Sequence, residues 1–238
     1  MQRRDVVRGA ALLGTAGLLP PLPPSPRRLK IVIAGAHPDD PESTSGGTMA
    51  RYADLGHEVV AAYLTRGEAG IEGKNETQAA AIRTAEAEAA CHILGARPRF
   101  LGQIDGRTEV TSARYDEMRH LLDEEGPDLV ITHWPLDTHR DHRACALLVH
   151  DAWLRSHRRF ALYFHEAMTG EQTHGFRPTH YVDITSVLGR KRAACEAHRS
   201  QNPPEFWTYH DQMQRFRGLE ARCAVAEAFC AADGERLP

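Results

Sequence analysis

From Leu29 onward, short apolar runs alternate with longer stretches in which apolar residues recur at helical spacing. Runs rich in β-branched residues predict buried strands, and the helical spacing predicts helices between them. The predicted strands cover 30–34, 58–64, 99–101, 128–132, 160–164 and 179–184. The predicted helices cover 46–55, 78–94, 112–125, 141–155, 187–199 and 212–231. This alternation predicts a three-layer, Rossmann-like α/β fold, with helices on both faces of a mostly parallel sheet.

Residues 1–28 have a different character from the rest of the chain. The pair Arg3-Arg4 precedes a modest apolar run at 10–19 and a Pro-rich stretch at 20–26. This order predicts an export signal with a Pro-rich linker, and the Arg pair resembles a twin-arginine signal. The alternative is an N-terminal tail that carries no targeting signal. The apolar run is too short for a stable membrane span, so we predict a periplasmic or extracellular protein whose single domain covers 29–238.

Composition narrows the classes of partner and cofactor. The 238 residues carry a formal net charge of −3 with 14 His uncounted, and no cluster of Lys and Arg interleaved with aromatic residues is present. We therefore expect a small-molecule or glycan substrate and no nucleic-acid partner, while the oligomeric state stays open. Five Cys form no CxxC pair, which argues against zinc bound through thiolates. One disulfide within the C-terminal segment stays possible.

Two polar motifs each follow a predicted strand. Ala-His-Pro-Asp-Asp at 36–40 comes directly after the first strand, and His-Arg-Asp-His at 139–142 lies after the strand 128–132, where a helix begins. In sheets of this kind, ligands bind beyond the carboxyl ends of the strands, where the strand order reverses. We therefore expect the two motifs to meet in one site.

The residue types in these motifs are those of a catalytic zinc site. Zinc binds His nitrogens and carboxylate oxygens at about 2 Å and keeps one position free for water. His37, Asp40 and His142 can supply three such ligands. Asp39 is next to a ligand without being needed as one, so it is placed to take a proton from metal-bound water.

Two more residues of the second motif have roles in this hypothesis. His139 is placed to stabilise charge on the substrate oxygen, and Asp141 to orient a His by a hydrogen bond. Taken singly, the first motif also fits a helix cap and the second a solvated helix face. Their combination after two apolar strands favours a metal site. For three further His near predicted strand ends or motifs we favour a packing role: His133, His165 and His198.

The first motif, with Pro41-Glu42 and Gly46-Gly47-Thr48 after it, resembles the opening motif of the PIG-L-type (LmbE-like) zinc de-N-acetylases. The second motif is similar to the family's second motif, and the two are specific in combination. Supporting similarity covers most of the chain from about Leu29, through the segments 64–68, 83–86, 94–95, 101–106 and 197–201.

The resemblance implies a zinc-dependent N-deacetylase, a hydrolase of linear amides that removes acetyl from a GlcNAc-type amino sugar or related glycoconjugate. By the same resemblance the zinc ligands are His37, Asp40 and His142. Asp39 is implied as the general base that activates the metal-bound water. His139 is implied as the residue that, with zinc, stabilises the oxyanion.

The resemblance also covers the substrate. Arg83 matches a family arginine that holds the substrate, and Asp105 lies near an acidic residue with a similar task. One departure concerns the proton donor for the leaving amine, because Asp137 occupies the place where some members carry a Tyr as general acid. That role is open between protonated Asp39, His139 and a Tyr from elsewhere, such as Tyr163.

Three rival interpretations remain. The first is a zinc hydrolase of another amide or an ester at the same site. The second is an oxidoreductase, but the dinucleotide-binding motif GxGxxG is replaced by His-Pro-Asp-Asp after the first strand. The third is a non-catalytic metal- or sugar-binding protein on the same fold.

Overall fold

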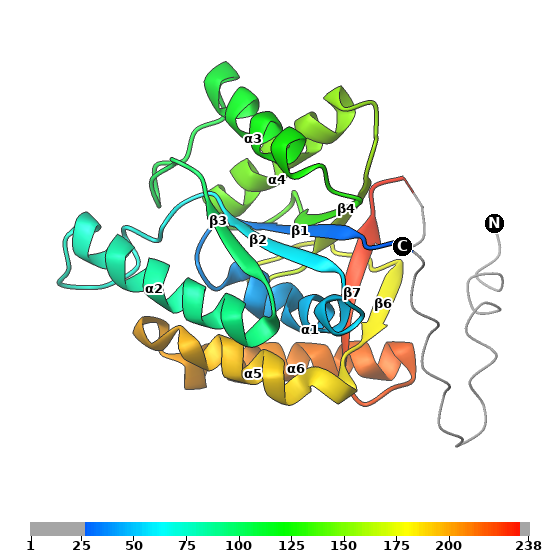
Figure 1. Ribbon diagram of the computed structural model, residues 1–238. Coiled ribbons are helices and arrows are strands. Elements are labelled where there is room, and N and C mark those ends of the chain that lie inside the picture. Colours follow the sequence, from blue (N-terminus) through cyan, green and yellow to red (C-terminus); the bar gives the residue numbers. More distant parts are fainter. Residues whose placement is uncertain (1–26, 234–238) are drawn as a thin grey trace.

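The computed structural model describes residues 27–233, so 1–26, which hold nearly all of the predicted export signal and linker, lie outside the described residues. The described part contains a seven-stranded sheet in the order β3-β2-β1-β4-β5-β7-β6 (Figure 1). Strands β1 to β5 are parallel, and β7 runs antiparallel to both of its neighbours. The strands are β1 (Lys30–Gly35), β2 (Glu58–Tyr63), β3 (Arg97–Phe100), β4 (Leu129–His133), β5 (Ala161–His165), β6 (His180–Asp183) and β7 (Ala226–Ala231).

Helices cover both faces of this sheet. Helices α3 and α4 lie on one face, and α1, α2, α5 and α6 lie on the other (Figure 1). Their bounds are α1 (Asp40–Asp54), α2 (Glu76–Leu94), α3 (Ser112–Glu125), α4 (Arg140–Arg155), α5 (Leu188–Ala197) and α6 (Pro203–Ala221). The predicted three-layer α/β fold is therefore confirmed. Among the described helices, none combines the length and apolar character that crossing a membrane requires.

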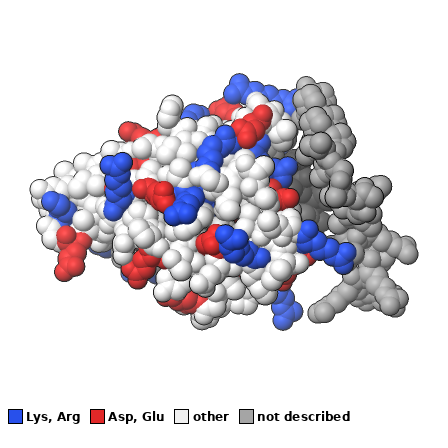
Figure 2. Space-filling view, turned by 90° about the horizontal axis from the view of Figure 1, so that it is seen from below, with Lys and Arg blue, Asp and Glu red and all other residues white. Residues whose placement is uncertain are grey.

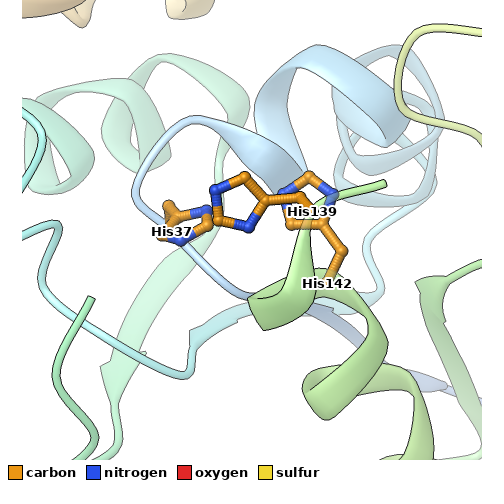
Figure 3. A group of neighbouring side chains, drawn as sticks. All are labelled: His37, His139 and His142. Carbon is orange, nitrogen blue, oxygen red and sulfur yellow. The ribbon is translucent and has the colours of Figure 1, made fainter. Parts of the chain in front are cut away.

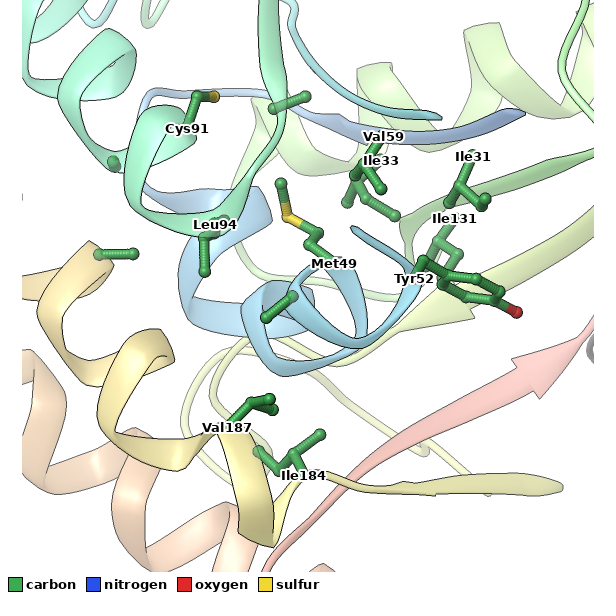
Figure 4. Packing of buried hydrophobic residues seen from close by; sticks show 14 of the residues in the cluster. Ile31, Ile33, Met49, Tyr52, Val59, Cys91, Leu94, Ile131, Ile184 and Val187 are labelled. Atoms are coloured by element: carbon green, nitrogen blue, oxygen red, sulfur yellow. The ribbon is translucent and has the colours of Figure 1, made fainter. Parts of the chain in front are cut away.

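The sheet separates two hydrophobic cores, and β1 contributes to both. Ile31 and Ile33 face the α1 side, whereas Val32 and Ala34 face the α4 side, as the two-residue period of a strand requires. Figure 4 shows Met49 of α1 packed close to Ile33. Each fully buried Ile or Val contributes about 1.5–3 kcal/mol, so β1 is fixed along its whole length and its carboxyl end is rigid.

The chain changes direction across the sheet between β1 and β4. After β1 it continues to β2 and β3 on one side, and after β4 it continues to β5 on the other. The carboxyl ends of β1 and β4 therefore flank a crevice at a topological switch point, where open α/β sheets bind ligands. His37 follows β1 and His139 follows β4, so both motifs lie at this crevice.

One prediction in the C-terminal part is wrong, and a possibility left open there is decided. The predicted helix 212–231 ends at Ala221, and Ala226–Ala231 form β7. The Ala-rich composition favours a helix, but β7 lies between β5 and β6 and its interstrand hydrogen bonds outweigh local propensity. The possible C-terminal disulfide is also absent among the described residues, because Cys223 and Cys230 are free thiols.

The surface beneath α5 and α6 carries charges of both signs. Figure 2 shows Lys and Arg interspersed with Asp and Glu over this face. Pairs one helical turn apart account for part of the pattern, as in Arg192–Glu196 and Arg215–Asp211. Exposed pairs of this kind contribute little to stability, and this face does not form a single-sign basic patch.

Candidate active site

The loop between β1 and α1 is held by a hydrogen bond from its own backbone to one of its side chains. The backbone N–H of His37 donates to Asp40 Oδ2 at 2.7 Å. Pro41 occupies the first turn of α1, where its missing N–H costs nothing. Asp39 precedes the helix with φ of 109°, in the left-handed region that non-glycine residues rarely adopt. This backbone places Asp39 and Asp40 next to His37 at the end of β1.

Asp40 lies between the two predicted His ligands. Its Oδ2 is 3.3 Å from His37 Nδ1, and its Oδ1 is 3.3 Å from His142 Nε2 in the first turn of α4. Ligand atoms about 2.0–2.2 Å from a tetrahedral zinc lie roughly 3.4 Å apart. Each distance is close to this value, although the two involve different oxygens of Asp40. Among the described residues, the groups whose ligand atoms all lie within 4.8 Å of one another are His37, His139 and His142; Asp40, His133 and His142; and His37, Asp105 and Asp141. The three predicted ligands come together from two segments far apart in the sequence.

A carboxylate lies behind each of these His. His37 Nε2 is 3.2 Å from both Asp141 Oδ2 and Asp105 Oδ1. His142 Nδ1 is 3.3 Å from Asp137 Oδ2. A carboxylate on the far nitrogen fixes the orientation of a metal-binding imidazole and makes it a better ligand. Asp141 thus has the geometry of its predicted role, and Asp137 supports His142 in the same way.

The electrostatics of this cluster favour a bound cation. Burial alone would lower the pKa of His37, but hydrogen bonds to Asp105, Asp141 and Asp40 raise it well above 6.5. Burial would raise the pKa of Asp40, yet His142 and His133 hold it well below 3.8. Carboxylates this close to the imidazoles stabilise positive charge at the cluster, which a divalent metal would supply.

His139 caps the amino end of α4 with its own side chain. Its Nδ1 accepts a hydrogen bond from the backbone N–H of Asp141 at 3.3 Å, which leaves the proton of the neutral ring on Nε2. Burial lowers the pKa of His139 and keeps the ring neutral. The rings of His37, His139 and His142 converge from the β1 loop and from α4 (Figure 3). His139 therefore presents an N–H donor beside the predicted metal ligands.

Asp39 and Arg83 form an ion pair at the edge of the cluster. Arg83 Nη2 donates to Asp39 Oδ2 at 2.8 Å and to the carbonyl oxygen of Pro38. Burial raises the pKa of Asp39 more than the charge of Arg83 lowers it. Arg83 and Asp105 both lie at the cavity with the predicted ligands, so the structure brings all of the predicted site residues into one region.

A cavity of about 270 Å³ opens above these residues. Its floor is formed by His37, Asp39, Asp40, His139 and His142. The opposite wall comes from the segment after β5 and from the C-terminal region, and consists of Met168, Gln172, Gln201, Phe206 and His210. No sequence pattern singles out His210, and only the resemblance at 197–201 points to any residue of this wall.

Tyr163 is not available to the reaction. It is fully buried on β5 in the core that faces α1, and it is not among the residues that line the cavity. The suggestion that Tyr163 is the general acid is therefore wrong. The side chains on β5 alternate between the two faces of the sheet, and this one faces the hydrophobic core.

The buried His133 and His165 form a chain of polar contacts behind Asp40. His133 Nε2 is 3.2 Å from Asp40 Oδ2, and His133 Nδ1 is 3.3 Å from His165 Nε2. His165 Nδ1 is in turn 3.0 Å from Thr44 Oγ1. Neither His lines the cavity, and His133 forms, with Asp40 and His142, one of the groups of described residues that could hold a metal ion. The contact of His133 also supports Asp40, a predicted metal ligand. The sequence pattern does not reveal this contact.

His210 makes the stability of the fold sensitive to acid. Burial, followed by the charge of Lys191, lowers the pKa of His210 from 6.5 to about 3. Between these values the unfolded chain binds a proton that the folded chain excludes, so stability falls as the pH falls, by up to about 1.4 kcal/mol per pH unit. We expect urea unfolding of His210→Gln to depend less steeply on pH from 6.5 to 4 than that of the wild type. Equal slopes of unfolding free energy against pH for the two proteins would contradict this expectation. The control is His92→Gln, because His92 is exposed.

Comparisons with known proteins identify relatives of this chain. A family model described as PIG-L: GlcNAc-PI de-N-acetylase matches residues 32–153. The chain is 31% identical over 194 residues to the diacetylchitobiose deacetylase of Thermococcus kodakarensis, an alignment that covers 75% of this chain and 72% of the relative. It is 25% identical over 217 residues to the 4-oxalmesaconate hydratase of Pseudomonas putida, with 83% of each chain covered.

A solved structure has the same architecture. The N,N'-diacetylchitobiose deacetylase from Pyrococcus horikoshii, complexed with its inhibitor MPG, superposes with a TM-score of 0.78 at 25% identity. The superposition covers 89% of this chain and 86% of that chain. The similarity thus covers most of the chain.

Proposed function

This chain belongs to the PIG-L family of de-N-acetylases, and from that premise we propose that it is a zinc-dependent deacetylase of GlcNAc-type amino sugars. The family and the similar chitobiose deacetylases support deacetylation of an N-acetylated sugar. One observation carries the finer proposal: Asp40 lies 3.3 Å from a nitrogen of both His37 and His142, at the floor of the cavity.

His37, Asp40 and His142 would hold the zinc, with Asp141 and Asp137 fixing the two imidazoles. Zinc bound there would supply a Lewis acid that activates water and polarises the amide oxygen.

The chain's own residues move the protons of the reaction. Asp39 accepts a proton from the water that attacks the acetyl carbonyl carbon, and its raised pKa suits this task. The Nε2–H of His139 donates to the oxygen that gains negative charge. The C–N bond then breaks, and the amine nitrogen needs one proton. Asp39 holds that proton, so we assign it to deliver the proton as acetate and free amine form.

The cavity favours an uncharged sugar. Among the described lining residues, Arg83 is the one Lys or Arg, and it is paired with Asp39. The wall opposite the predicted ligands presents two amides and the aromatic ring of Phe206, which suit sugar hydroxyls and the apolar face of a pyranose. The name of the related 4-oxalmesaconate hydratase denotes a carboxylate substrate. Such a substrate would find no unpaired guanidinium or ammonium group among the described lining residues.

The test is acetate release from a matched pair of sugars by protein of known metal content. We expect turnover of N-acetylglucosamine or N,N'-diacetylchitobiose, at least about 10-fold lower kcat/KM for N-acetylglucosamine 6-phosphate, and loss of activity on chelation. Activity that survives complete metal removal would contradict the zinc proposal. Preference for the phosphorylated sugar would contradict the uncharged substrate.

The same assay separates the rival functions. Hydrolysis of simple esters or peptides without acetate release from sugars would identify another hydrolase at the same residues. Zinc binding without any turnover would identify a non-catalytic protein. Each result is distinct because acetate, metal content and the alternative substrates are measured on one preparation.

A further inference from the structure

The guanidinium of Arg83 is directed at the segment that carries the proposed base. Arg83 extends from the middle of α2, and its Nη2 donates both to the carbonyl oxygen of Pro38 and to Asp39 Oδ2. Only 3% of Arg83 is exposed. The contacts therefore hold the backbone and the side chain of one short segment at the same time.

Two glycines form a slot around this guanidinium. A Cβ on Gly67 would lie 2.5 Å from both Cδ and Nη1 of Arg83, and a Cβ on Gly70 would lie 2.2 Å from Nη1. Real Cβ atoms essentially never approach this closely, so a side chain at either position would displace the guanidinium. Gln201 Nε2 donates to the carbonyl oxygen of Gly70 at 3.0 Å and ties the slot to the C-terminal segment.

The segment that Arg83 contacts needs external support. The φ of 109° at Asp39 lies in a region where a non-glycine residue persists only when its surroundings hold it. Arg83 supplies such a contact on each side of the Pro38–Asp39 link. Nη2 is committed to these two acceptors, and Nη1 faces the glycine slot. Nε is buried without a hydrogen-bond partner among the described residues, so the hydrogen bonds that Arg83 makes are those to Pro38 and Asp39.

We propose that Arg83 is a positioning residue, which holds the carboxylate of Asp39 in its reacting orientation. This inference rests on the proposed function and adds a role toward Asp39 to the substrate role that the sequence resemblance implies. A residue that aligns the base affects the chemical step, whereas a residue that binds sugar in the ground state affects KM.

Steady-state kinetics of Arg83→Lys and Arg83→Ala separate these two roles. We expect kcat to fall roughly 100-fold in both, with KM within about threefold of the wild type. Lys keeps the charge but cannot reach both acceptors with a planar fork. Added guanidinium should restore part of kcat in Arg83→Ala, where the slot is vacated, and none in Arg83→Lys.

A further variant perturbs the ion pair between Arg83 and Asp39 without changing either residue. Gly70→Ala places a Cβ where Nη1 lies, so we expect its kcat to fall while KM and zinc content stay unchanged. Gly189→Ala is the matched control, because it lies on α5 and a Cβ there meets nothing within 4 Å. We expect that control to keep wild-type kcat.

The outcomes that overturn the proposal are specific. A large rise in KM with unchanged kcat in Arg83→Lys would make Arg83 a substrate-binding residue. Urea unfolding of Arg83→Lys, Asp39→Asn and the double variant gives a test that needs no activity. Additive losses in that cycle would show that the two side chains are not coupled. If the wild type releases no acetate, the proposed function fails, while the unfolding cycle still decides whether Arg83 holds Asp39.

Discussion

Asp39→Asn is expected to keep its zinc and lose nearly all turnover, with kcat lowered roughly 10²–10⁴-fold. Asn has the size of Asp but no basic oxygen that can take a proton at neutral pH. It also tolerates a positive φ better than most residues, so the 109° backbone at this position is compatible with the substitution. Because Asp39 is not among the proposed ligands, its loss leaves His37, Asp40 and His142 in place.

The experiment needs kcat and zinc content from the same preparation. Asp54→Asn is the matched control, because this exposed residue makes the same chemical change at the other end of α1 and contacts only a surface arginine. We expect wild-type kcat and zinc content from that control. A zinc-free Asp39→Asn protein would mean that Asp39 is a ligand, and the assigned roles of Asp39 and Asp40 would then be wrong.

The parallel half of the fold could be predicted because its strands are buried on both faces. Runs such as Ile31-Val32-Ile33 are apolar and β-branched throughout, and the helix predicted at 112–125 has the bounds of α3. The start of α1 at Asp40, six residues earlier than predicted, was missed. The polar residues at 40–45 lack the apolar spacing that predicts a helix. Tertiary contacts of Thr44 and Ser45 with His165 stabilise this turn of α1 instead.

The floor of the site could be predicted because each motif directly follows a strand that the sequence identifies. The opposite wall could not be predicted in the same way. His210 and Phe206 lie on α6, and their direction depends on how that helix packs after the turn at Asn202. The same C-terminal region contains β7, whose pairing with β5 and β6 is a long-range property.

Asp137 shows how a departure from a family motif can be misread from sequence alone. The absence of a Tyr at this position identified a missing proton donor. The structure shows what the replacement does: Asp137 Oδ2 lies beside His142 Nδ1, and Oδ1 accepts the N–H of His139 at 2.8 Å. The carboxylate therefore supports a predicted ligand, and proton delivery is left to a group already in the cavity.

His142→Ala is expected to lose zinc, with affinity lowered by more than about 100-fold. The substitution removes one of three ligands and leaves Asp40 Oδ1 without its 3.3 Å partner. Competition against a chelator of known affinity measures the effect, and thermal unfolding of the zinc-free proteins shows whether the fold survives. Asp137→Asn keeps the ligand but weakens its support, so we expect an intermediate loss of roughly 10–100-fold. His120→Ala, on the exposed side of α3, should bind zinc as the wild type does. A folded His142→Ala protein with wild-type affinity would exclude His142 as a ligand.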